Sequence, residues 1–437
     1  MIFLISFFIF LIFLKLLFFW LWFWQLKEYH IGRFVTHFKE GQAIKKIISG
    51  FWRLKYPKFT KKIIIISLTS IFLAILMLLR GFYFSVFYLI IIVPLIFQIP
   101  TAIWKKRFLE KARKKREQFP NLLVIGITGS YGKTSVKEFL YTILSSKFNV
   151  LKTKEHKNSE VGIAQTVLSE LNKDHQIFIV EMGAYNRGGI KLLCDIVQPQ
   201  IGILTGINEQ HLATFGSLKN IIKTKFELIE SLPPDGVAFL NGKNQYCVEL
   251  YQRIKIKKKL YGQEAKTALL ENVEGAKAVA QELGLTEKDV WKACREIKGQ
   301  LPSIKLKKGK NNIDIIDATY SANPDGVIAH LDYLKTLIGK KIIIMPCLIE
   351  LGSASQEIHQ RIGRKIAQTC DLAIITTKDK FKEIKDAAEK EGMKAENILF
   401  LSKPEVILNK INLFCSPGDI ILLEGRVPNN LIQLLIE

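Results

Sequence analysis

LLVIGITGSYGKTSVKEFL, residues 122–140, joins an apolar strand-like run, a glycine-containing loop and an amphipathic helical stretch. Glycines in such a loop let backbone N–H groups close around phosphate oxygens, and the N-terminus of the following helix favours negative charge. Lys133 is placed to reach the β- and γ-phosphates of a nucleotide, and the Thr134 hydroxyl is placed to bind Mg²⁺. The stretch therefore predicts an α/β domain that uses ATP and Mg²⁺ as cofactors.

The loop is a short variant of the usual phosphate-binding pattern. That pattern has a first glycine five residues before the second, and Ile127 stands at this position. An ordinary strand-to-helix turn that contains GKT by chance is the alternative, but the strand, the helix and the lysine occur together in the required order. We therefore predict that the nucleotide is bound by Gly129, Ser130, Gly132, Lys133, Thr134 and Ser135.

From residue 121 onward, short apolar and β-branched runs alternate with amphipathic helical stretches. This alternation is typical of doubly wound α/β domains. The lysine-rich run 253–259 alternates with isoleucine and is interpreted as a solvated edge strand. The expected fold is a phosphate-loop α/β ATPase domain at 118–300, followed by a Rossmann-like α/β domain at 301–437. We expect strands near residues 122–128, 176–181, 201–205, 237–240, 313–317, 341–345, 372–376 and 419–423.

Upstream of the phosphate loop, residues 1–117 contain three apolar runs, at about 1–24, 63–79 and 82–100. Each run is about long enough to cross a bilayer as a helix. The first run lacks the short apolar core and the small-residue cleavage site of a signal peptide. We therefore predict three transmembrane helices, of which the second and third form a tight hairpin.

The charge of the chain is concentrated in the same region. Residues 1–117 hold 20 Lys and Arg against four Glu, so this segment carries +16 of the total charge of +23. Under the positive-inside rule, the basic stretches 25–62 and 101–117 lie in the cytoplasm. The expected localisation is a multi-pass membrane protein with its N-terminus outside and its catalytic domains in the cytoplasm. Membrane lipid is a further expected partner. The basic stretches could also recognise an anionic lipid, but orientation alone explains them. Nucleic acid is not an expected partner, because the basic residues are not on a folded module.

Six motifs after the phosphate loop resemble those of the Mur ligase family, most closely its D-alanyl-D-alanine-adding branch. They are HKNSEVG (156–162), FIVEMGA (178–184), TGINEQHL (205–212), the segment from FGSL (215–218) through Lys225 to Glu227, DATYSANPD (317–325), and IELG (349–352) with His359. The resemblance covers about residues 118–437. It implies a ligase that joins amino acids or peptides to a carboxylate through an acyl phosphate.

Two motifs place side chains where metal ligands are needed. Glu181 stands at the carboxyl end of a buried strand, where it can hold Mg²⁺ together with Thr134. His211 follows another strand end and is expected on the same rim, although a single histidine is often a packing or capping residue. We predict as ligands of Mg²⁺ the residues Thr134, Glu181 and His211.

Other roles are implied by the resemblance alone. Lys225 corresponds to the family's modified lysine and would carry a carbamate, whereas its spacing on a charge-rich helix predicts an ordinary solvated lysine. The expected catalytic residues are then Lys133, His211 and Lys225. The resemblance implies that Asn158 and Glu160 face the acceptor substrate. It also implies that Asp317 and Asn323 contact the adenosine of ATP.

The chain departs from the family at two places. The family normally begins with a soluble domain that binds the uridine diphosphate part of the substrate, and membrane segments are expected here instead. The acceptor would then be membrane-associated or held by another protein. The family also has an Arg after the Leu-Pro at the domain junction, whereas Leu301-Pro302 is followed by Ser303, Ile304 and Lys305. Lys305 can supply charge there, but without a bidentate guanidinium.

The predicted function is ATP-dependent amide bond formation in the synthesis of peptidoglycan precursors. An amino acid or the D-alanyl-D-alanine dipeptide would be added to the carboxylate of an acceptor. A membrane-bound ligase similar to poly-γ-glutamate synthase is one alternative, which the apolar segments favour. A non-catalytic, ATP-binding membrane scaffold is another, and a scaffold would have no need of the full set Lys133, Thr134, Glu181, His211 and Lys225.

Overall fold

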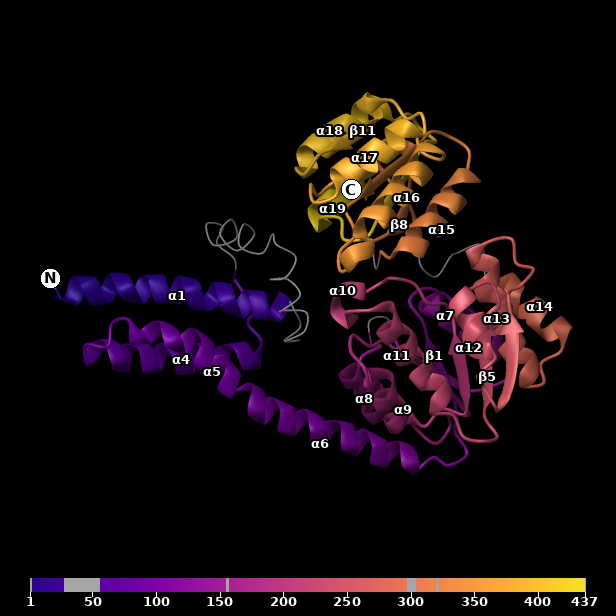
Figure 1. Ribbon diagram of the computed structural model, residues 1–437, viewed down its shortest axis with the longest axis horizontal. Helices are drawn as coiled ribbons and strands as arrows, with labels where there is room; N and C mark the ends of the chain where they lie inside the picture. Colours follow the sequence, from indigo (N-terminus) through magenta and orange to yellow (C-terminus); the bar gives the residue numbers. More distant parts are fainter. Residues whose placement is uncertain (1, 27–55, 155–156, 297–303, 320–321, 437) are drawn as a thin grey trace. The chain divides into compact units, whose positions relative to one another are not determined.

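The computed structural model describes residues 2–26, 56–154, 157–296, 304–319 and 322–436 (Figure 1). The chain divides into two units, residues 1–110 and 111–437, which are described separately. The junction residues 301–303, where the family's Arg would follow, lie outside the described part, as does most of the predicted cytoplasmic stretch 25–62.

The first unit is built from apolar helices: α1 (Ile2–Leu26), α4 (Lys61–Leu79), η1 (Ser85–Tyr88), α5 (Leu89–Ile96) and the start of α6 (Gln98–Glu117). Among the described residues, three segments are long and apolar enough to cross a membrane: Phe3–Leu26, Lys61–Leu79 and Ser85–Glu117. The third extends well beyond the predicted 82–100. Its polar second half stays helical because Lys, Arg, Glu and Ala have high helix propensity.

These helices pack against one another through apolar side chains. In α1, the buried residues Phe13, Leu17 and Leu21 recur every four positions and therefore share a face. They form a core with Ile63, Ile66, Ala74, Leu78, Val86, Ile90 and Val93. The opposite faces are also apolar, with exposed residues such as Phe3, Leu68 and Phe72. Helices that are apolar all round are typical of membrane spans.

The second unit begins with a six-stranded sheet of order β2-β3-β1-β4-β5-β6, in which every pair is parallel. Its strands are β1 (Leu123–Thr128), β2 (Val150–Lys152), β3 (Ile177–Glu181), β4 (Ile201–Leu204), β5 (Val237–Asn241) and β6 (Lys257–Tyr261). The helices are α7 (Lys133–Leu144), α8 (Glu160–Ser169), α9 (Gly189–Val197), α10 (Leu212–Phe215), α11 (Leu218–Glu230), α12 (Gln245–Tyr251), α13 (Ala268–Glu282) and α14 (Glu287–Glu296).

Helices cover both faces of this sheet. Ile125 and Ile127 of the central strand β1 belong to one core with residues of α7, α13 and α14. Between them, Gly126 faces the other side, where Leu228 of α11 packs so closely that a Cβ would clash with it. This alternation follows the period of two along a strand. The doubly wound arrangement predicted for the phosphate-loop domain is therefore confirmed.

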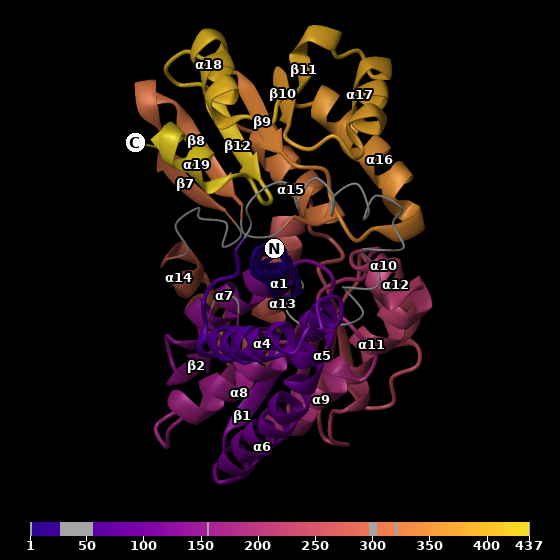
Figure 2. The same cartoon turned by 90° about the vertical axis from the view of Figure 1, so that its left-hand side faces the viewer.

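A second six-stranded sheet has the order β11-β10-β9-β12-β8-β7, and only the edge strand β7 is antiparallel. Its strands are β7 (Lys305–Lys308), β8 (Asp314–Ala318), β9 (Lys341–Met345), β10 (Leu372–Ile375), β11 (Ile398–Phe400) and β12 (Ile420–Glu424). The connections contain short 3₁₀ helices: η2 (Lys310–Asn312), η3 (Gly352–Ala354) and η4 (Ala395–Asn397). One face packs against α15 (Pro324–Lys335), α16 (Ser355–Ala367) and α17 (Phe381–Lys390), and the other against α18 (Pro404–Phe414) and α19 (Asn429–Ile436). Helices α16 and α17 lie side by side (Figure 2).

The eight predicted strands are present within two residues of their expected ends. Three further strands, β2, β7 and β11, were not predicted. Strands β2 and β11 have three residues each, and β7 is the lysine-rich sequence KLKK. Strands this short, or this rich in lysine, carry a weak hydrophobic pattern. The lysine-rich run predicted as an edge strand does lead into β6 at the edge of its sheet, but pairing begins only at Lys257.

Candidate active site

The phosphate loop connects the carboxyl end of β1 to the start of α7. Gly129 and Gly132 have positive backbone φ angles, of 154° and 77°, which residues with a side chain rarely adopt. A Cβ on Gly129 would clash with the Thr205 hydroxyl, and one on Gly132 would lie 2.5 Å from Asn272 Oδ1. The two glycines therefore meet both a conformational and a steric requirement of the loop.

The Lys133 ammonium folds back over this loop. Its Nζ donates to the carbonyl of Gly129 at 2.7 Å and to that of Ser130 at 3.4 Å. Burial lowers the pKa of Lys133, and the nearby Glu181 carboxylate opposes that shift. The lysine predicted to neutralise phosphate charge is thus held against the residues predicted to bind the phosphates.

Glu181 is the centre of a buried polar cluster at the end of β3. Its Oε2 accepts from Thr134 Oγ1 at 3.0 Å and lies 3.2 Å from Lys137 Nζ, while Oε1 accepts from Asn158 Nδ2 at 3.1 Å. Burial raises the pKa of Glu181, but Lys137, Lys133 and the Asn158 hydrogen bond outweigh it, so this pKa falls below its usual value. The cluster presents an ionised carboxylate beside a hydroxyl, both of which are hard oxygen donors suited to Mg²⁺.

The described residues contain no group of three or more His, Cys, Asp and Glu side chains that could hold a metal. Binding of Mg²⁺ would therefore rely on a few protein ligands, Thr134 and Glu181 among them, together with the nucleotide's own phosphates. This is the usual manner of Mg²⁺ binding, because the ion takes one or two protein carboxylates together with phosphates and waters. The residues fit the metal in that sense.

His211 precedes α10 in the left-handed region, with φ 65°. Its Nδ1 lies 2.6 Å from Oε2 of Glu350, and its ring stands edge-on to Tyr185 at a centroid distance of 4.9 Å. Burial lowers the pKa of His211, against the opposing effect of Glu350, and the charges of Lys225 and Lys133 lower it further. The structure therefore brings the three predicted catalytic residues into mutual electrostatic range.

The structure contradicts the expectation, based on spacing alone, that Lys225 is an ordinary solvated lysine. It is only 4% exposed, on the inner face of α11, and is not a solvated lysine. Burial, followed by repulsion from Lys133, lowers the pKa of Lys225 to about 7. At neutral pH a large share of this amine is uncharged, and an uncharged amine is a nucleophile.

Of the two residues expected to face the acceptor, Asn158 belongs to the Glu181 cluster. Asn158 contacts Glu181 directly, and its carbonyl accepts from the Gly183 N–H at 2.8 Å. Glu160 is the first residue of α8, after the cap residue Ser159, whose hydroxyl accepts from the backbone of the first turn. A carboxylate at this position is stabilised by the helix dipole. Asn158 thus joins the segment predicted to receive the acceptor to the Glu181 cluster.

The residues expected to contact adenosine have local partners in the C-terminal domain. Asp317 accepts from Lys307 Nζ at 2.7 Å and from Thr319 Oγ1 at 2.6 Å. These contacts outweigh burial and lower the pKa of Asp317. Asn323 caps α15 by accepting from the Gly326 N–H at 3.0 Å. Their roles toward a nucleotide remain predictions.

Three residues of the site were missed from sequence: Asn208, Asp325 and Glu350. The backbone N–H of Asn208 donates to Ser130 Oγ at 3.2 Å, and its Nδ2 donates to Asp325 Oδ2 at 2.6 Å. Asp325 also accepts from Arg361 at 3.0 Å. A chain of hydrogen bonds thus runs from the phosphate loop into the C-terminal domain. All three residues lie inside motifs already noted, but their pairing joins segments more than 100 residues apart.

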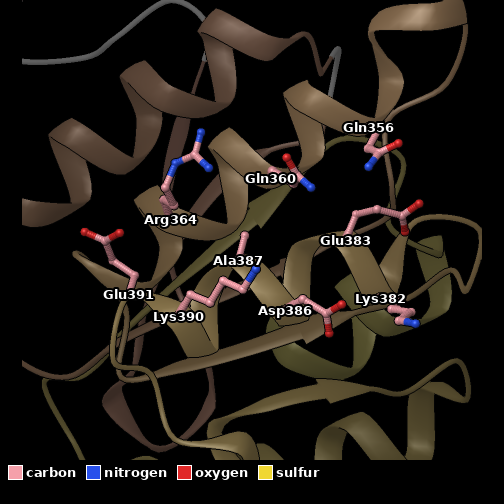
Figure 3. Close-up of a pocket in the computed structure, with 9 residues that line it drawn as sticks. All are labelled: Gln356, Gln360, Arg364, Lys382, Glu383, Asp386, Ala387, Lys390 and Glu391. Carbon is pink, nitrogen blue, oxygen red and sulfur yellow. The ribbon is translucent and has the colours of Figure 1, made fainter.

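A separate hollow of about 450 Å³ lies between α16 and α17 (Figure 3). Its lining consists of Gln356, Gln360, Arg364, Lys382, Glu383, Asp386, Ala387, Lys390 and Glu391. Charges of both signs alternate along it, and none of the predicted site residues contributes. We interpret it as a solvated groove between two surface helices.

Two family models match the chain in succession. The Mur ligase middle domain matches residues 127–305, and the Mur ligase glutamate ligase domain matches residues 304–427. The chain therefore belongs to the Mur ligase family, whose members are ATP-dependent, ADP-forming ligases.

Several similar proteins are D-alanyl-D-alanine-adding members of that family. The UDP-N-acetylmuramoyl-tripeptide–D-alanyl-D-alanine ligase of Synechocystis sp. is 32% identical over 299 residues, which are 62% of this chain and 62% of that protein. The ligase of the same name from Bacillus subtilis is 26% identical and covers 72% of this chain and 76% of its own length. A crystal structure of MurF from Acinetobacter baumannii superposes with a TM-score of 0.66 at 25% identity, covering 76% of this chain and 80% of that chain. The chain thus spans about three fifths of the length of the Synechocystis relative.

Proposed function

We propose that this protein is an ATP- and Mg²⁺-dependent ligase that forms an amide bond in the synthesis of a peptidoglycan precursor. The observation that carries the proposal is the contact of Thr134 with Glu181 beside the Lys133 loop, in a chain of the Mur ligase family. The names of the relatives favour D-alanyl-D-alanine as the added group and a muramoyl tripeptide as the acceptor.

The proposed reaction needs no enzyme nucleophile. An oxygen of the acceptor carboxylate attacks the γ-phosphorus of ATP, and the bond from that phosphorus to the ADP oxygen breaks. The amine of the incoming group then attacks the acyl carbon, phosphate leaves with the former carboxylate oxygen, and the amine loses a proton. Lys133 stabilises the charge that develops on the phosphoryl oxygens. Mg²⁺, held by Thr134 and Glu181, would supply further charge neutralisation.

The remaining roles follow from this chemistry. His211 would complete the metal site from the same rim, and a carbamate on Lys225 would add an anionic oxygen donor. Asn158 and Glu160 would receive the acceptor. Asp317 and Asn323 would contact the adenosine, after release from part of their present hydrogen bonding.

We also propose that the protein is membrane-bound, with domains at 1–117, 118–300 and 301–437 and both catalytic domains in the cytoplasm. Three apolar helical segments and the basic residues that follow the last of them support this topology. Trp104 stacks on Phe108 at 5.0 Å near the end of the apolar stretch, where aromatic residues suit the headgroup region. Anionic headgroups would contact the basic half of α6.

This topology predicts the side from which a cysteine at position 2 is labelled. In a background without native cysteines, an impermeant maleimide should label Ile2→Cys in intact cells. Gln118→Cys, just after α6, should be labelled only after the membrane is permeabilised. Labelling of position 2 only from the cytoplasmic side would rule out the three-span arrangement with its N-terminus outside.

The function itself is tested with detergent-purified protein, ATP, Mg²⁺ and a panel of amino acids, D-alanyl-D-alanine and acceptors. We expect ADP and amide in equal amounts when the dipeptide and a muramoyl tripeptide are present. Comparison of a nucleotide-linked with a lipid-linked acceptor shows whether the substrate is carried on the membrane. Incorporation of glutamate alone would favour the poly-γ-glutamate type of ligase, which the apolar helices also suit. Nucleotide binding without amide formation would favour a scaffold.

A further inference from the structure

His211 and Glu350 contact each other across the seam between the middle and C-terminal domains. The two side chains meet at 2.6 Å, Nδ1 to Oε2, and the backbone N–H of Ala213 donates to the Glu350 carbonyl at 3.1 Å. Glu350 is therefore attached to the start of α10 by both its side chain and its backbone. Gly352 packs against the same turn, where a Cβ would lie 3.4 Å from Ala213 N.

Both partners have an unusual backbone. His211 and Glu350 each have φ 65°, and they are two of five residues other than glycine with positive φ in the described part of the chain. This conformation is unfavourable for residues with a Cβ, and it persists where the surrounding structure enforces it. Both partners of one hydrogen bond adopt this conformation. We therefore infer that the fold enforces the contact, and that it is not a chance meeting of two surface groups.

The contact determines which nitrogen of the imidazole is available. Nδ1 is engaged by Glu350, and the edge-on packing of Tyr185 restricts rotation of the ring. A ligand must then be met by Nε2. A carboxylate that binds the other ring nitrogen fixes the tautomer and raises the basicity of a metal-binding histidine.

We propose that Glu350 is a positioning residue that the C-terminal domain supplies to the metal site by orienting His211. The inference rests on the proposed function and adds to it a residue to which the family resemblance assigns no role. Seating of the C-terminal domain would thereby be sensed at the metal site, because the Glu350 carboxylate contacts His211 of the middle domain. The hydrogen bond from Asn208 to Asp325 is a second, separate contact across the same seam.

The test measures metal affinity, not turnover. Binding of Mn²⁺ to the full-length, detergent-purified protein with saturating ADP is followed by electron paramagnetic resonance. Glu350→Ala is expected to weaken Mn²⁺ binding by about 10- to 100-fold, the usual effect of removing such a partner. Glu350→Gln should recover most of that loss, because its amide oxygen still accepts from Nδ1–H. Glu357→Ala, an exposed carboxylate in α16, is the matched control and should have no effect.

Two further variants separate this role from others. Asp325→Ala removes the other seam contact, which also reaches the phosphate loop through Asn208, and should weaken Mn²⁺ binding by a smaller factor than Glu350→Ala. An effect equal to that of Glu350→Ala would show a general loss of domain seating and overturn the inference. His211→Ala should weaken Mn²⁺ binding at least as much as Glu350→Ala. If His211→Ala weakens binding and Glu350→Ala does not, Glu350 has no positioning role and the proposed function stands. If neither variant changes the affinity, the assignment of His211 to the metal fails as well. Unaltered thermal melting of each variant confirms folding.

Discussion

Replacement of Lys133 by alanine is expected to reduce ATP-dependent amide formation to a few per cent of the wild-type rate or less. The side chain donates to the carbonyls of Gly129 and Ser130, so its loss leaves the apolar core intact. Its ammonium contacts the loop that would hold the phosphates. Removal of one such group from a site where charge develops typically costs roughly 100-fold or more in rate.

The measurement is release of ADP coupled to amide formation, with thermal melting as the check on folding. Lys147→Ala, an exposed lysine just beyond the same helix, is the matched control and should retain full activity. A Lys133→Ala protein that folds and keeps more than a few per cent of the turnover would contradict the assignment of the loop.

Lys225→Ala is expected to be nearly inactive and to be partly rescued by short-chain carboxylates. The pKa of about 7 leaves much of this buried amine uncharged at neutral pH, as the addition to carbon dioxide requires. The resulting carbamate is an anion with hard oxygen donors, which Mg²⁺ prefers, whereas a buried ammonium would repel the metal. Depletion of bicarbonate should also slow the wild-type enzyme.

Lys223→Ala provides the control within the same helix. Lys223 is exposed, two residues from Lys225, so its substitution should change the rate little. Near-normal turnover of Lys225→Ala would show that the carbamate is not needed. Equal stimulation of both variants by acetate would show that the rescue is not specific to the vacated space.

The central strands and the phosphate loop were predictable because their patterns are local. Strands β1, β3, β4 and β5 are continuous apolar runs, as expected for strands covered on both faces. The contact of Thr134 with Glu181 was also predictable, since the ends of neighbouring parallel strands meet at one edge of a sheet. Strands β2 and β11 were missed because three residues carry too little periodicity to be recognised.

Burial of Lys225 had a signal that the charge of its helix obscured. Ile221, Lys225 and Ile229 are spaced by four residues and therefore share one face of α11, and all three are buried. A lysine on the apolar face of a helix is unusual enough to mark a functional site. The pairing of His211 with Glu350 had no such signal, because it joins residues 139 positions apart on two domains.

Transfer of oxygen from the acceptor to phosphate tests the central claim most directly. The reacting carboxylate of a muramoyl tripeptide acceptor is labelled with ¹⁸O, and the phosphate released during turnover with D-alanyl-D-alanine is analysed by mass spectrometry. Because the carboxylate oxygen attacks the γ-phosphorus and later leaves with it, we predict one ¹⁸O atom in phosphate for each amide formed. Release of unlabelled phosphate alongside amide formation would contradict an acyl phosphate intermediate and the account built on it.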